Sequence, residues 1–240
     1  MLPYLRLETL RAIRSPAFVA YTVGFPVGFY LLFTSVFDFG AIGGSDFSAY
    51  YMVSMGVYGS IGVGMLSIGA RIANERTRGW TRQLALSPLR PQDYVAVKVI
   101  SAALLGLPVV VAILVAGGLV NGVQLPVATW AGLGLALWLA GLPFAMLGVA
   151  IGYTFRDELA QMVSMSAYFL LSVAGGLWLP SAMFPAWMAR VSEALPTHQA
   201  AAVAWRVLEG APPFQPGFAV LVAWVVVFAS LAMWRYRRAS

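Results

Sequence analysis

Long apolar stretches, each of a length that crosses a bilayer as a helix, constrain this chain more than any other feature of its sequence. A transmembrane helix needs about 20 mostly apolar residues to cross roughly 30 Å of hydrocarbon. Six stretches meet this requirement: Ala17–Phe37, Ser48–Ala70, Val99–Val120, Val127–Tyr153, Met162–Leu179 and Pro216–Trp234. Only 10% of the 240 residues are charged, whereas soluble domains have about 25%. The sequence therefore predicts an all-α polytopic membrane protein with six transmembrane helices, folded as one transmembrane domain over residues 1–240.

The basic residues are concentrated on one side of these predicted spans. Of the 15 arginines and lysines, all but Arg190 and Arg206 lie in the N-terminal segment, in the loops after the second and fourth spans, or in the C-terminal tail. Because short basic loops remain in the cytoplasm, we expect a multi-pass protein of the inner or plasma membrane with both termini in the cytoplasm. The net charge of +6 does not indicate a nucleic-acid partner, since these residues form no separate basic domain.

The chain lacks the residues that several classes of membrane protein require. The six predicted spans contain no Asp, Glu, Lys, Arg or His, although carriers and pumps usually hold a coupling ion on such groups. A P-loop needs a lysine that follows glycine, but the single lysine, Lys98, follows Val97. Cysteine is absent and His198 is the one histidine. We therefore expect no catalytic residue, metal site or bound cofactor in this chain, and an outside source of energy for any uphill transport.

The loop between the second and third predicted spans, residues 71–98, holds six of the 15 basic residues. One interpretation is an electrostatic contact with anionic lipid headgroups. However, the loop is longer than a turn between two spans requires, and it also contains Trp80, several leucines, and Pro88 and Pro91 at either side of a turn. These residues favour a folded docking surface, because a short helix held in a groove of a partner protein transmits force. Asp93 is a candidate cap for the helix that leads into the third span.

The segment ERTRGWTRQLALSPLRPQDYVAVK, residues 75–98, resembles the same loop in permease subunits of ABC transporters of the type-2 export class. Seven positions match the pattern of that family: Glu75, Arg76, Gly79, Leu84, Ser87, Pro88 and Lys98. Val97 departs from the pattern, because many members have glycine there. The resemblance implies a coupling helix that docks on a separate ATP-binding subunit, in which ATP and Mg²⁺ bind. The residues implied for this ATPase coupling are Glu75, Arg76, Arg78, Gly79, Arg82, Leu84 and Pro88.

The N-terminal segment, residues 1–16, shows an apolar stripe at helical spacing. Glu8, Arg11 and Arg14 fall on the opposite face. This pattern predicts an amphipathic interfacial helix on the cytoplasmic membrane surface. The segment also resembles the connecting helix that leads into the first span in the same family.

Residues 180–209, between the fifth and sixth predicted spans, contain two short helical patterns. Ala186–Leu195 and Thr197–Leu208 are separated by Pro196, and neither is long enough to cross the bilayer. Resemblance to the type-2 permeases implies an extracellular re-entrant hairpin here, introduced by the run GGLWLP. His198, at the start of the second pattern, is expected to be a cap or interfacial residue rather than a metal ligand.

Pairs of glycines four residues apart occur in the first and fourth spans, at Gly24 with Gly28 and at Gly148 with Gly152. Small residues let helices approach closely in lipid, so we expect packing within one subunit, with a substrate path or a dimer interface as the alternative. Resemblance to the family places the second and fifth spans near the translocation path. The candidates for lining it are Met55, Tyr58, Ser164, Tyr168, Phe169 and Ser172.

The charged run Arg156, Asp157 and Glu158 follows the fourth predicted span. Adjacent carboxylates on a helix point about 100° apart, and no nucleophile or metal ligand accompanies them. General acid–base chemistry is therefore not indicated. We expect a cluster at a helix start that forms a second contact with the ATPase.

Together with the observations above, the resemblance implies the non-catalytic permease subunit of an ATP-driven ABC exporter, forming half of the translocation path. The expected partners are an ABC ATP-binding subunit, a second permease copy or a related permease, and membrane lipid. Sparse hydroxyls in apolar spans suit amphipathic drugs, antibiotics or lipids as cargo. A self-powered secondary carrier or channel is the first alternative, and an intramembrane enzyme is the second.

Overall fold

The computed structural model describes residues 5, 7, 9–10, 14–37, 39–42, 44–79, 91–212 and 216–239. The chain is helical over most of this length and has one two-stranded antiparallel hairpin, in which Ala41 pairs with Asp46 and Ile42 with Ser45. The elements are α2 (Pro16–Val19), η1 (Ala20–Gly24), α3 (Phe25–Val36), β1 (Ala41–Ile42), β2 (Ser45–Asp46), α4 (Phe47–Leu66), α5 (Gly69–Thr77), α7 (Pro91–Val115), η2 (Ala116–Val120), α8 (Val127–Ala140), α9 (Leu142–Thr154), α10 (Asp157–Ala174), η3 (Ser181–Met183), α11 (Ala186–Ala194), α12 (Pro196–Leu208) and α13 (Pro216–Ala239).

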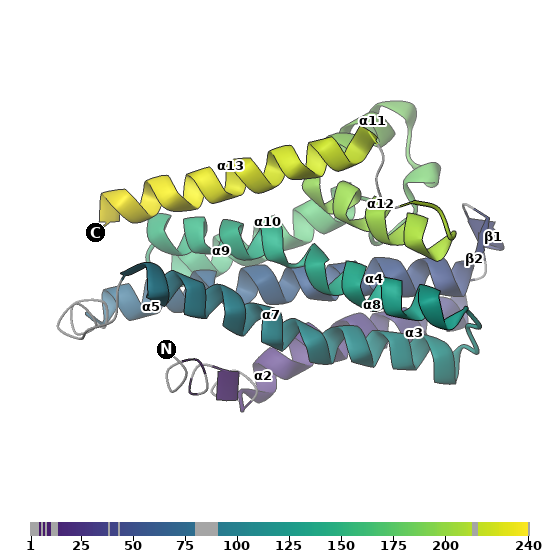
Figure 1. The fold of residues 1–240 in the computed structure, drawn as a ribbon, viewed down its shortest axis with the longest axis horizontal. Helices are drawn as coiled ribbons and strands as arrows, with labels where there is room; N and C mark the ends of the chain where they lie inside the picture. The colour runs from purple at the N-terminus through teal and green to yellow at the C-terminus, as the bar shows by residue number, and fades with distance from the viewer. Residues whose placement is uncertain are drawn as a thin grey trace.

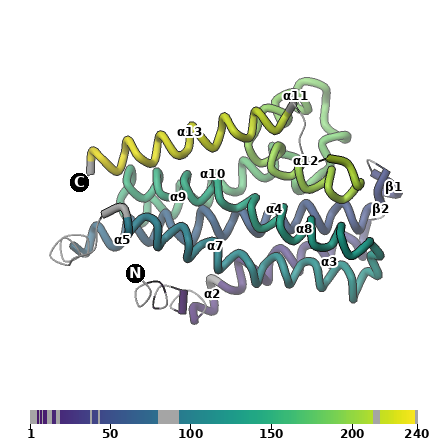
Figure 2. The backbone as a smooth tube through the Cα atoms, viewed as in Figure 1, coloured from purple at the N-terminus to yellow at the C-terminus, as the bar shows by residue number. Residues whose placement is uncertain are grey.

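The long helices run side by side along the longest axis of the molecule (Figure 1). Helix α5, the start of α7 and the C-terminal end of α13 lie at one end of this bundle, which we call the α5 end. Helices α11 and α12 and the β-hairpin lie at the opposite end, the α12 end (Figure 2). The predicted N-terminal helix falls largely outside the described residues, and so does most of the loop that joins α5 to α7.

Four helical segments of the described chain are long and apolar enough to cross a membrane by length and composition. They are Phe47–Thr77, Asp93–Val120, Val127–Thr154 and Gly217–Arg238. This finding fits a multi-pass, all-α membrane protein, but it does not reach the six spans that the sequence predicts. The first predicted span is represented by a shorter apolar helix, Ala20–Val36.

The fifth predicted span differs most from its expected range, Met162–Leu179. The helix at this place, α10, begins at Asp157 with two acidic residues in its first turn, and it ends at Ala174. Gly176 adopts a positive φ of 81°, a left-handed conformation that ends helices. The polar start and the early glycine stop together explain why the apolar part of α10 is shorter than the sequence pattern predicts.

Helix α4 is the centre of the bundle, and most of its residues are buried. It packs against α3, α7, α8, α9, α10 and α12. A helix that is surrounded on all sides needs apolar residues all round, and it also needs small residues wherever a neighbour approaches closely. Gly64 is an example of such a close approach, because a Cβ at this position would collide with the carbonyl oxygen of Gly141.

Close glycine contacts continue along the seam between the α4–α5 segment and α9. A Cβ on Gly152 would lie 2.7 Å from the carbonyl oxygen of Gly69, and one on Gly148 would lie 3.0 Å from that of Gly64. The second glycine pair of the sequence therefore serves packing within this chain, as predicted. The first pair differs, because a Cβ on Gly24 or Gly28 would meet nothing within 4 Å.

Helix ends follow the sequence signals closely. The predicted fourth span divides at Gly141 into α8 and α9, with Pro143 at the start of α9, as expected of a proline that cannot continue the helical hydrogen bonds. The two short helices expected between the fifth and sixth spans are α11 and α12, and Pro196 is the first residue of α12. Helix α5 ends before Gly79, which has a φ of 72°.

Candidate functional site

Three consecutive residues of α5 contact three different helices at the α5 end of the bundle. They are Asn74, Glu75 and Arg76. Successive side chains of an α-helix point about 100° apart, so a run of three can reach in three directions. Because α5 lies against α9 and α10 and faces α7, each direction has a helix to receive it.

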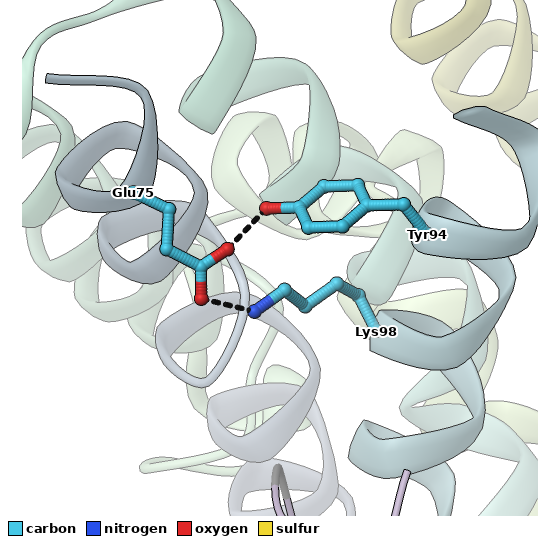
Figure 3. A network of polar contacts seen from close by, with 3 residues as sticks. All are labelled: Glu75, Tyr94 and Lys98. Atoms are coloured by element: carbon cyan, nitrogen blue, oxygen red, sulfur yellow. Dashed lines mark hydrogen bonds and ion pairs between the residues drawn. The ribbon is translucent and has the colours of Figure 1, made fainter. Parts of the chain in front are cut away.

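Glu75 joins α5 to α7 through both oxygens of its carboxylate (Figure 3). Lys98 donates to Oε1 from 2.6 Å, and the hydroxyl of Tyr94 donates to Oε2. Tyr94 and Lys98 are four residues apart on α7, so they share one face of that helix. The Lys98 ammonium also lies 5.3 Å from the centre of the Tyr94 ring.

This ion pair is buried, since the side chain of Lys98 is 1% exposed and that of Glu75 is 15% exposed. A buried charge is costly unless it is paired and hydrogen-bonded. Here the lysine is paired, and the carboxylate has a donor on each oxygen. Glu75 and Lys98 lie just outside the predicted spans Ser48–Ala70 and Val99–Val120, although both fall within helical segments, Phe47–Thr77 and Asp93–Val120, that are long and apolar enough to cross a membrane.

Arg76 joins α5 to the last turn of α9. Its Nη1 donates to the carbonyl oxygen of Gly152 at 2.9 Å, and its guanidinium lies 5.3 Å from the centre of the Tyr153 ring. The last carbonyl groups of a helix have no partner inside the helix and carry a partial negative charge. A cation is therefore a favourable partner at this position.

Asn74 joins α5 to the start of α10, because its side-chain amide donates to Oδ1 of Asp157 at 3.0 Å. Asp157 has a positive φ of 23°, which is unusual for a residue other than glycine. Its neighbours Arg156 and Glu158 are exposed. A polar cavity of about 330 Å³ lies beside this contact and is lined by Ser15, Ala70, Arg71, Asn74, Glu75, Asp157 and Gln161.

The residues implied for ATPase coupling are only partly described by the structure. Glu75 and Arg76 point into the bundle, as set out above. Arg78 is exposed at the end of α5, and Gly79 follows it. The positions of Arg82, Leu84 and Pro88 lie outside the described residues. The docking role of this set, and that of the run Arg156, Asp157 and Glu158, stays a prediction.

The candidates for a translocation path are mostly buried inside this single chain. Met55 and Tyr58 belong to α4, and Ser164, Tyr168 and Ser172, spaced four positions apart, form one buried face of α10. The Tyr168 hydroxyl donates to the Tyr58 carbonyl oxygen at 3.1 Å. Phe169 is the one member of the six that is well exposed. These contacts join α4 to α10, and the path-lining role of the six residues stays a prediction.

Sequence reasoning missed two features of the folded chain. The first is the set of partners of Glu75, although the spacing of Tyr94 and Lys98 on one helix face was a usable signal. The second is an aromatic cluster in which the Trp178 ring lies 4.7 Å from Phe29 and 5.3 Å from Phe169. Phenylalanines repeat every four residues from Phe25 to Phe37, and this repeat predicts an aromatic row along α3.

At the α12 end, a different short helix packs on α4. Trp205 of α12 stacks on Tyr50 with a centroid distance of 4.8 Å, and its Nε1 donates to Ser54 Oγ at 3.2 Å. Thr197 donates to the Leu171 carbonyl oxygen at 2.6 Å. These contacts tie α12 to α4 and α10 without an ionised group.

His198 lies in the first turn of α12, where its Nδ1 is 3.2 Å from the Gly175 carbonyl oxygen and 3.2 Å from Ser192 Oγ. Burial lowers the pKa of His198 below its ordinary value of 6.5, although the contact with Gly175 acts in the opposite direction. Within the described part of the chain, no group of three or more His, Cys, Asp or Glu side chains is placed to hold a metal ion.

Comparison with known proteins gives two matches that cover most of the chain. A family model described as "ABC-2 family transporter protein" matches residues 36–234. A protein of Bacillus subtilis (strain 168) named "Putative transport permease YvfS" is 28% identical over 231 residues, which is 96% of this chain and 94% of that protein. The family match includes α4, α5 and α7, and therefore both sides of the Glu75 contact.

Proposed function

Since the chain belongs to the ABC-2 family of transporter proteins, we propose that it is the membrane permease subunit of an exporter driven by a separate ATP-binding subunit. ATP and Mg²⁺ bind in that partner, and this chain carries no cofactor and no catalytic group. Two permease chains, identical or related, enclose the path, and each supplies half of it.

The observation that carries this proposal is the attachment of α5 to three neighbouring helices. Helix α5 ends at Thr77, and α7 begins at Pro91. A loop that receives force from a partner transmits it only if its base is firmly joined to the helices that must move. The buried pair of Glu75 with Lys98 and the bond from Arg76 to α9 supply such a base.

The arrangement of the bundle supports the orientation proposed here. Helix α5 and the basic C-terminal end of α13 lie at the same end of the molecule (Figure 1), and we assign this end to the cytoplasm because basic segments remain there. The α12 end then faces outward, with α11 and α12 as the external hairpin. In this arrangement the chain crosses six times, with α3 and α10 as its two shorter crossings.

We propose amphipathic drugs, antibiotics or lipids as the cargo class. The exposed surface of the bundle is rich in large apolar side chains, and an apolar path with few hydroxyls suits molecules that already partition into membranes. Export, rather than import, is the direction proposed for such molecules.

A self-powered carrier is the competing function, and one observation favours it. Glu75 and Lys98 form a buried acid–base pair inside helices of spanning length, and groups of this kind carry protons in pumps and transporters. Transport by the purified chain in a proton gradient, without nucleotide, separates this function from the one proposed.

The proposed function is tested by affinity purification of the tagged chain from its native membrane, followed by measurement of ATP hydrolysis. We expect an ATP-binding cassette protein in stoichiometric amount and nucleotide hydrolysis by the complex. Leu84→Asp in the loop should lower the amount of that protein by about tenfold or more, because a charge placed in an apolar contact costs several kcal/mol. Val191→Asp on α11, at the α12 end, is the matched control and should leave the complex intact. Docking through this loop is contradicted if both variants keep the complex, or if both lose it to the same extent.

A further inference from the structure

We propose that Asn74, Glu75 and Arg76 form a three-way joint that passes movement of the loop to α7, α9 and α10, and that Glu75 and Arg76 are positioning residues rather than contacts for the ATP-binding subunit. This inference rests on the proposed function. It changes the role that the family resemblance implies for the two charged residues, from docking on a partner to joining helices within the permease.

The contacts of Glu75 leave little of its side chain accessible to a partner protein. Both carboxylate oxygens accept hydrogen bonds from α7, and the side chain is 15% exposed. A partner that recruited Glu75 would have to separate it from Lys98, which is 1% exposed. Removing one member of a buried ion pair leaves the other charge uncompensated, and this is strongly unfavourable. Docking through Glu75 would therefore oppose the stability of the permease.

The position of the pair in the chain gives it a mechanical role. Glu75 lies just before the point where α5 ends, and Lys98 lies in the second turn of α7. The ion pair therefore closes the base of the loop that joins the two helices. A push on the loop displaces α5 and α7 together, because the bond between them is short, charged and shielded from water.

Arg76 and Asn74 extend the joint to the other side of α5. Arg76 bonds to the last turn of α9, which packs against α13 and α5, and Asn74 bonds to the first turn of α10. Three side chains on one short helix thus reach three neighbouring helices. The exposed neighbour Arg78 lies just beyond this set, at the C-terminal end of α5, and it is better placed to meet a partner.

The joint predicts a specific defect, in which docking and ATP hydrolysis continue but the permease no longer responds. The test uses the full complex with the paired change Glu75→Gln and Lys98→Met. This change removes both charges, keeps similar volumes and leaves an acceptor for Tyr94, so it avoids an unpaired buried charge. The exchanged pair Glu75→Lys and Lys98→Glu restores an ion pair in reverse. Arg237→Gln, which removes an exposed charge from the end of α13 at the same end of the molecule, is the control.

The response is read at the far end of the molecule. The chain has no cysteine, so Val191→Cys on the exposed face of α11 provides a single thiol whose labelling rate is measured with and without ATP. We expect the neutral pair to retain the ATP-binding subunit and its hydrolysis within about twofold, yet to lose the ATP-dependent change in labelling. The exchanged pair should recover at least part of that change, and Arg237→Gln should keep it.

Two results would overturn the joint. If the neutral pair loses the ATP-binding subunit while its melting temperature stays at the wild-type value, Glu75 or Lys98 is a docking residue. If the neutral pair keeps the full ATP-dependent labelling change, the ion pair does not transmit movement. The proposed function fails by a different result, in which the otherwise unaltered chain neither retains an ATP-binding protein nor responds to ATP.

Discussion

The two ends of the bundle attach a short helix to the longer helices by different chemistry. At the α5 end, Asn74, Glu75 and Arg76 use a buried ion pair and charged hydrogen bonds. At the α12 end, Trp205 and Thr197 use ring stacking and neutral hydrogen bonds. Buried hydrogen bonds between charged groups have a well-defined geometry, and breaking them costs much free energy. Rearranging neutral contacts costs less free energy. If the α5 end passes movement as proposed, its charged contacts are the ones expected to hold their geometry, and the neutral contacts of the α12 end are the ones expected to change.

The largest effect is expected from Lys98→Met, which leaves the carboxylate of Glu75 without its cation. The free energy of unfolding should fall by about 3–5 kcal/mol, as for other buried pairs that lose one partner. Thermal or denaturant unfolding of the detergent-solubilised protein measures it. Adding Glu75→Gln should recover most of the lost stability. If Lys98→Met lowers the free energy of unfolding by less than about 1 kcal/mol, the value of an exposed pair, the ion pair is exposed to solvent and not buried.

The glycine seam beside the joint gives the next effect. Gly152→Leu would put a Cβ 2.7 Å from the Gly69 carbonyl oxygen and 2.8 Å from Ile72 Cβ. Overpacking of this kind costs about 1–3 kcal/mol, measured by the same unfolding experiment. Gly28→Ala is the control, since its Cβ meets nothing within 4 Å, and equal effects of the two changes would contradict the close seam.

A smaller effect is expected at the α12 end from Trp205→Phe. This change keeps the ring stacked near Tyr50 but removes the hydrogen bond to Ser54, so the loss should be about 1 kcal/mol. Trp187→Phe is the control, because Trp187 is 68% exposed on α11. A loss as large as that of Lys98→Met would remove the contrast between the two ends.

The smallest effect concerns the pH dependence of His198. Because burial lowers its pKa in the folded chain, the unfolded chain binds the proton more readily, and stability should fall as the pH drops below 6.5. Melting temperatures at about pH 7.5 and about pH 5.5 measure this. The fall should be smaller in His198→Gln, and a rise in stability at low pH that depends on His198 would show that its pKa is raised.

The sequence predicted helix boundaries well where local residues decide them. Pro196 separates α11 from α12 as expected, and the backbone effects of Pro143 and Gly79 are equally local, because α9 begins and α5 ends beside these residues. The all-α membrane fold follows from apolar length alone. The sequence overestimated the fifth span, because a hydropathy pattern does not include the turn that Gly176 imposes.

The candidate site was harder to predict, for a physical reason. A sequence shows that Glu75 and Arg76 are charged and lie near the membrane, but the helix that receives each side chain depends on how α5 is rotated against its neighbours. Solvent and a partner protein are the usual partners of such charges, so an outward direction was the natural expectation. The burial of Lys98 follows from packing between α5 and α7, which no local pattern contains.

Transport in liposomes tests the central claim, that this permease takes its energy from a separate ATP-binding subunit. Two probes, a fluorescent phosphatidylethanolamine and the cationic dye rhodamine 6G, are followed with the permease alone in a proton gradient and with the complex plus ATP. The account predicts movement of a probe against its gradient only when both subunits and ATP are present. Accumulation of either probe by the permease alone would contradict it.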